Sequence, residues 1–107
     1  MTQFRGGMSE LMRQAARLQR KVEQRKEELK SVTIETSTGN DQVKVVANGG
    51  REIVSIKIDP TLLTGEDLSL TEDLIVAGVN AALQKANQMV EEELEKVSGG
   101  IKMPGIV

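Results

Sequence analysis

The sequence predicts an α+β protein in which a long N-terminal helix is followed by a three-stranded antiparallel meander and a long C-terminal helix. Three observations predict this order. Residues 8–37 contain neither Gly nor Pro and begin with apolar residues at heptad spacing, which is typical of a long helix. Three segments rich in β-branched residues follow, separated by turn signals. A capping-box pattern then precedes a broad apolar band, which predicts the second helix.

The chain has the length of one domain, with 107 residues. We expect a single domain over residues 1–107, with flexible tails at 1–7 and 99–107. The apolar share of 38% is lean for a globular protein, and a chain this small buries a limited fraction of its surface. We therefore expect association between subunits to supply part of the buried surface.

The first helix is expected over residues 8–30. Its narrow apolar stripe has coiled-coil-like spacing and consists of Met8, Leu11, Ala15, Leu18, Val22 and Leu29. Arg25 is the one misfit at a stripe position. Such a helix is about 35 Å long, and so narrow a stripe cannot be buried along one small sheet. The helix should therefore project from the protein or pair with another helix.

Basic residues occupy the opposite face of this helix. Arg13, Arg17 and Arg20 follow one another at intervals of four and three residues, and Lys21 lies beside them. The planar guanidinium group suits phosphate oxygens. Like charges at this spacing repel one another mildly, and we expect no acid near the first two arginines, which favours an anionic ligand. The alternative is an ordinary solvated helix face.

Three strands are expected over residues 32–37, 42–47 and 51–58. The turn between the last two contains Asn48–Gly49, which predicts a type I′ hairpin turn. In the third strand, alternation places Val54, Ile56 and Ile58 on one face. The strands are therefore expected to form a meander with one apolar face.

The second helix is expected to begin at Ser69, which opens a Ser-x-x-Glu capping box, and to continue to about Val97. Before it, Asp59–Pro60 ends the third strand, and a short helical turn is expected over residues 60–63. The apolar band of the second helix is broad enough to cover a sheet or another subunit, and small residues within it permit close approach.

The composition excludes several classes of function. The chain has no Cys and no His, so it lacks the usual zinc ligands and a Ser-His-Asp triad. With one aromatic residue it has no platform for stacking bases. We expect no enzymatic activity, no cofactor, no metal and no small-molecule substrate. The lack of cysteine favours the cytoplasm, and no apolar run approaches the roughly 20 residues of a membrane span, so no membrane partner is expected.

Charge is distributed unevenly along the chain. The formal net charge is −2, yet residues 1–30 carry an excess of Lys and Arg, whereas residues 59–107 carry an excess of Asp and Glu. Such asymmetry is typical of a protein with one end that faces a polyanion.

Several segments in order resemble one known family. They are Gly6–Met8 with Leu11–Ala15, Val43–Gly49, Ile56–Leu63, Glu72–Ala77 with Asn80–Ala82, and Val97–Gly100. Together they resemble the YbaB/EbfC family of bacterial nucleoid-associated proteins over nearly the whole chain. The resemblance implies a cytoplasmic, non-enzymatic homodimer with projecting helices, which binds double-stranded DNA and influences nucleoid organisation and gene expression. Two departures are Lys102, which interrupts an apolar ending, and the acidic second half.

Two hypotheses follow. The first is a homodimeric double-stranded DNA-binding protein of the nucleoid, in which each protomer offers Arg13, Arg17, Arg20 and Lys21 to the phosphates of the duplex. The alternative is an adaptor or chaperone-like module, whose apolar stripe around Met8, Leu11 and Leu18 pairs with a partner helix without nucleic acid.

Overall fold

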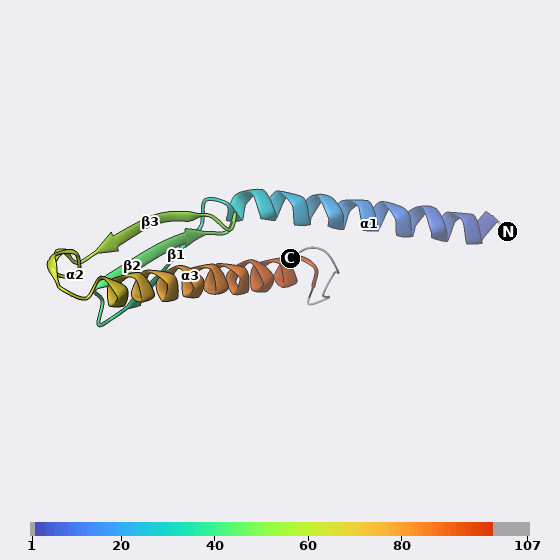
Figure 1. The fold of residues 1–107 in the computed structure, drawn as a ribbon. Helices are drawn as coiled ribbons and strands as arrows, with labels where there is room; N and C mark the ends of the chain where they lie inside the picture. The colour runs from blue at the N-terminus through green and yellow to red at the C-terminus, as the bar shows by residue number, and fades with distance from the viewer. Residues whose placement is uncertain (1, 100–107) are drawn as a thin grey trace.

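The computed structural model describes residues 2–99 and gives side chains from residue 7 onward. The elements are α1 (Thr2–Leu29), β1 (Thr33–Thr38), β2 (Val43–Asn48), β3 (Ile53–Ile58), α2 (Pro60–Thr64) and α3 (Leu68–Val97). This order confirms the predicted α+β class and the short helical turn at Pro60. The molecule is elongated, measuring 78 × 19 × 15 Å, because α1 extends far beyond the rest of the chain (Figure 1).

The first helix begins at Thr2, so the predicted start at Met8 was wrong. The Gly6–Gly7 pair, which directly precedes the predicted start, lies inside α1. A glycine costs a helix only about 1 kcal/mol, which is too little to end one. Of the expected tails, residues 2–7 therefore belong to this helix, and residues 100–107 lie outside the described part of the chain.

The sheet has the order β1-β2-β3, and both pairings are antiparallel. Helix α3 packs across β1 and β2 and barely meets β3. Two hydroxyl groups of β1 fix this packing, since Thr36 donates to the Gly78 carbonyl at 3.2 Å and Thr38 to the Leu74 carbonyl at 3.0 Å. The core between helix and sheet consists of Val43, Val45, Ala47, Ala82 and Ala86. The small residues of α3 thus permit the close approach that the sequence predicted.

A β-bulge changes the predicted face of β3. Val46 pairs with Ser55, but the next residue, Ala47, pairs with Ile53, which leaves Val54 unpaired. The prediction that Val54 shares a face with Ile56 and Ile58 was wrong: beyond the bulge, Ile53 takes its place against the core. Val54 is 54% exposed as a result.

The β2–β3 turn also differs from the predicted type I′ form. The Arg51 amide donates to the Asn48 carbonyl at 3.1 Å, and Arg51 has a φ of 61°. No described glycine of this turn has a positive φ; the only described glycines with one are Gly39 and Gly99. The connection is therefore a turn followed by a left-handed residue, which is the usual form of a three-residue hairpin loop.

The N-cap of α3 is Asp67, not the predicted Ser69. The Asp67 carboxylate accepts a hydrogen bond from the Leu70 amide at 3.0 Å, which satisfies one of the unpaired amides of the first turn. We predict that Asp67→Ala lowers the free energy of unfolding by about 1 kcal/mol. Ser69→Ala, which removes the predicted cap, is expected to change it by much less. Urea denaturation followed by circular dichroism measures both, and a larger effect at Ser69 would contradict the assignment.

The C-terminal part of α1 pairs with α3, and the N-terminal part projects from the protein (Figure 1). Val22 and Leu29 of α1 are buried against Val90 and Leu94 of α3. Beyond this contact the apolar stripe is uncovered, and Met12, which flanks it, is 70% exposed. We call the projecting part of α1, residues 7–21, the arm. Both predicted outcomes for the stripe, pairing and projection, are thus confirmed within a single helix.

Candidate nucleic-acid interface

The arm carries all four predicted DNA-binding residues. Arg13, Arg17, Arg20 and Lys21 are exposed. The three arginines lie on the face of α1 opposite the apolar stripe, and Lys21 lies beside them. At 1.5 Å per residue, Arg13 and Arg20 are about 10 Å apart along the helix axis. The structure therefore brings the four cations to one open face that a long polyanion can reach.

One acid lies closer to this face than the sequence predicted. The Arg13 guanidinium is 3.5 Å from a Glu10 carboxylate oxygen, so the expectation of no acid near the first two arginines was wrong. Both side chains are largely exposed, and an exposed ion pair contributes little to stability. A phosphate oxygen can therefore take the place of Glu10 at small cost.

An ion pair holds the last part of α1, residues 22–29, to α3. We call this part the root of the arm. Arg25, the misfit in the heptad stripe, reaches Glu93 at 3.1 Å and also Glu28 at 3.1 Å. The hydrogen bond from Arg25, joined by one from Lys96, keeps the pKa of Glu93 below its ordinary value. This link between the helices is therefore present above the ordinary pKa of a glutamate and weakens as the pH falls through the lowered pKa of Glu93.

The β2–β3 turn fixes the other side of the root. The Gly49 amide lies 3.1 Å from the Leu29 carbonyl and 3.0 Å from the Val32 carbonyl. A Cβ atom at Gly49 would lie only 2.2 Å from the Leu29 oxygen, so only glycine permits this approach. The end of α1 is thus fixed between the turn and α3, and its direction sets where the arm points.

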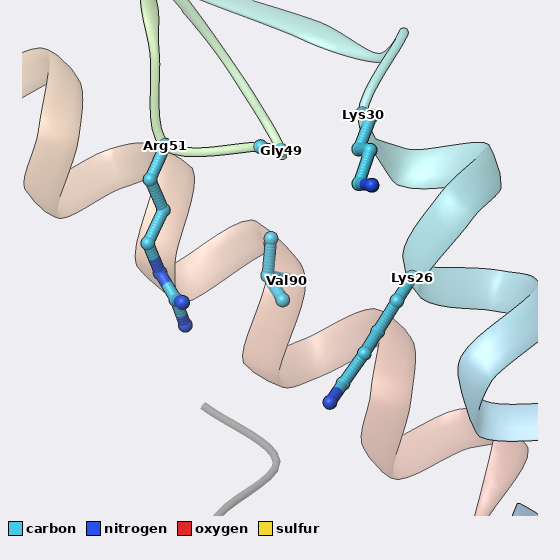
Figure 2. Close-up of a pocket in the computed structure, with 6 residues that line it drawn as sticks. Lys26, Lys30, Gly49, Arg51 and Val90 are labelled. Carbon is cyan, nitrogen blue, oxygen red and sulfur yellow. The ribbon is translucent and has the colours of Figure 1, made fainter.

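A hollow of about 190 Å³ lies beside this root, between α1, the β2–β3 turn and α3. Its lining residues are Lys26, Lys30, Gly49, Gly50, Arg51 and Val90 (Figure 2). The sequence does not predict this cluster of three cations, because Arg51 comes from the turn and lies near the lysines only in the fold. The four-residue spacing of Lys26 and Lys30 is the one feature of the sequence that points to it.

An apolar surface remains uncovered where α3 does not reach the sheet. Ile56 pairs with the buried Val45, yet it is 41% exposed because α3 barely meets β3. Other exposed apolar side chains of β3, α2 and α3 are Val54, Leu63, Leu68, Leu70 and Val76. We call these six residues the β3 face. Exposed apolar side chains on neighbouring elements make this part of the molecule a candidate interaction surface.

Two further classes of site are absent from the described part of the chain. Across residues 2–99, no helix has both the length and the apolar character needed to cross a membrane. In the same part of the chain, no three acidic side chains come together as a metal site would require. Near the end of α3, successive acidic residues point around the helix axis and not to one point; they are Glu91, Glu92, Glu93 and Glu95.

Comparison with known proteins identifies relatives along nearly the whole chain. A family model described as the YbaB/EbfC DNA-binding family matches residues 5–101. A protein of Myxococcus xanthus named "Nucleoid-associated protein" is 50% identical over 95 residues, which cover 89% of this chain and 90% of the relative. Proteins with the same name from Pelotomaculum thermopropionicum and Moorella thermoacetica are each 44% identical, and the matches cover 94% of this chain and 96% of each relative.

Proposed function

Because the chain belongs to the YbaB/EbfC DNA-binding family, we propose that it is a nucleoid-associated protein that binds double-stranded DNA without catalysis. The observation that carries the proposal is the open face of Arg13, Arg17, Arg20 and Lys21 on the arm. The contacts go mainly to phosphates, with arginine available for base edges or a narrow minor groove. The proposed location is the cytoplasm, on the nucleoid, with effects on nucleoid organisation and gene expression.

The proposed active form is a homodimer that uses two arms. Support comes from the β3 face, whose apolar side chains are exposed among residues 2–99, and from the edge of β3, which can accept a further strand. Two-fold symmetry would then set the spacing of the two basic faces. The acidic surface of α3 would repel the duplex and so restrict it to the arms.

Salt dependence tests the DNA contact. If four cations per protomer touch phosphates, a dimer neutralises about eight charges, and log K should fall with log salt at a slope of about −7. We expect this slope in a fluorescence-anisotropy titration with a labelled 20-base-pair duplex. A slope near zero contradicts the proposed interface.

Substitution on the β3 face tests the dimer. We expect Ile56→Asn to halve the mass measured by sedimentation equilibrium at micromolar concentration, because it places an amide in the proposed interface. DNA affinity should fall with it, since a monomer has only one basic face. Met12→Asn is the matched control, with a more exposed apolar residue outside the β3 face. Dissociation by Met12→Asn and not by Ile56→Asn would place the contact on the arm instead.

A second candidate function is the helix-pairing adaptor. The uncovered apolar residues Met8 and Leu11 on the arm favour it. Capture of a protein partner that Leu11→Asp abolishes, together with no gel shift of duplex DNA at low salt, would favour the adaptor over the DNA-binding protein.

A further inference from the structure

The hollow beside the root of the arm brings together three cations from distant parts of the chain. Lys26 enters it from α1, Lys30 from the turn that follows α1, and Arg51 from the β2–β3 turn (Figure 2). Val90 lies between Arg51 and Lys26 in this view and forms an apolar floor. None of the described residues that line the hollow is acidic, and the acids near its lysines, Glu23, Glu27 and Glu52, lie outside its lining. The described lining therefore carries three positive charges in a protein whose net charge is −2.

The arginine is held in place by the backbone and by a side-chain contact. Arg51 has a φ of 61°, in the left-handed region where glycine is the unstrained residue. Its Nε atom donates a hydrogen bond to Asn87 Oδ1 of α3 at 2.8 Å. This conformation belongs to the three-residue hairpin loop described above. The contact with Asn87 holds the side chain of Arg51 over α3 (Figure 2).

The two lysines carry charge that a ligand can reach. Their partners are exposed glutamates of the same helix: Glu23 lies 3.5 Å from Lys26, and Glu27 lies 2.8 Å from Lys30. The hydrogen bond with Glu27 raises the pKa of Lys30, which keeps the ammonium group charged. Exposed pairs of this kind hold weakly, so a multivalent anion that meets three cations at once can displace both glutamates.

We propose that this hollow binds a phosphate group. Two ammonium groups and a planar guanidinium are the donors that phosphate oxygens prefer. Gly49 and Gly50 contribute only backbone atoms to the lining of the hollow. The site does not depend on the DNA contact proposed above.

The phosphate has one of two sources. Lys26 follows Arg17 by nine residues, which places it about half a turn around α1 at 100° per residue. Lys30 follows Arg20 by ten residues, which would place it only about 80° from that arginine. The ligand is either a backbone phosphate of DNA or the phosphate of a small molecule.

The test is a titration of the ¹⁵N-labelled full-length protein at constant ionic strength, first with inorganic phosphate and then with a short duplex. Phosphate is expected to shift the amide resonances of Gly49, Gly50 and Arg51 at millimolar concentration. Arg51→Gly should weaken this binding by about tenfold, as expected for loss of one charge-assisted contact. Glycine suits the left-handed backbone, so this variant is expected to fold. Lys57→Gln, which removes an exposed cation of β3 outside the hollow, is the control and should bind phosphate like the unmodified protein.

The duplex identifies the source. If excess duplex shifts the same three amides and competes with phosphate, the ligand is a DNA backbone; if it shifts only resonances of the arm, the ligand is a small phosphate compound. Chloride that produces the same shifts as phosphate, or an Arg51→Gly variant that binds phosphate as the unmodified protein does, overturns the proposal. Failure of the duplex to bind at all would refute the DNA-binding function alone, because the phosphate titration would still test the hollow.

Discussion

Replacement of both Arg13 and Arg17 by alanine is expected to lower the affinity for duplex DNA by about three orders of magnitude at roughly 0.1 M salt. In a dimer the double variant removes four of the eight proposed phosphate contacts, and each contact contributes about 0.9 to the slope of log K against log salt. The slope should therefore change from about −7 to about −4. Both side chains are exposed, so the fold should not change. Fluorescence anisotropy over a series of salt concentrations measures affinity and slope together.

The control for this experiment removes the same charge from another surface. Lys44 and Lys57 face each other on β2 and β3 and are exposed. The double variant Lys44→Ala/Lys57→Ala has the same net charge as Arg13→Ala/Arg17→Ala. It should retain most of the affinity and nearly the full slope. Equal losses in the two variants would mean that net charge, and not the arm, governs binding. Unchanged binding in the arginine variant would remove the arm from the interface.

Gly49→Ala should cause the largest loss of stability, about 3 kcal/mol or more in the free energy of unfolding. The added methyl group would meet the Leu29 carbonyl oxygen at 2.2 Å and its carbon at 2.8 Å. Both are backbone atoms, so relief requires movement of the turn or of the end of α1. Such movement also stretches the contacts of the Gly49 amide with Leu29 and Val32. Urea denaturation followed by helical circular dichroism measures the loss.

Gly7→Ala is the matched control for the turn variant. Gly7 lies in α1, and a Cβ atom there would meet nothing within 4 Å. Alanine should therefore raise helix stability by up to about 1 kcal/mol. A Gly49→Ala variant that unfolds at the same urea concentration as the unmodified protein would show that the root of the arm is not fixed by this contact.

Local patterns in the sequence were sufficient to predict the elements and the arm. The heptad spacing predicted α1, and its single misfit, Arg25, has an explanation only in the fold, where it pairs with Glu93 of α3. The exposure of Arg13 and Arg17 also follows from their position opposite the apolar stripe. Whether these residues bind DNA stays a prediction that the titrations above can test.

Features that depend on contacts across the fold could not be predicted. The bulge at Val54 is set by pairing between β2 and β3, and alternation within one strand carries no information about it. The turn glycine at position 49 is needed for its approach to Leu29, not for a type I′ turn. The hollow escaped prediction for the same reason, because Arg51 lines the same hollow as Lys26 and Lys30 only after the turn has packed against the end of α1 and α3.

The length of the arm also affects how the protein behaves in solution. The radius of gyration of the single chain is 20.6 Å, whereas a compact domain of this size has one of about 13 Å. A lone protomer should therefore diffuse slowly and elute from a sizing column like a globular protein of much greater mass. The apparent size on such a column cannot distinguish one chain from two, so light scattering or sedimentation must supply the subunit count.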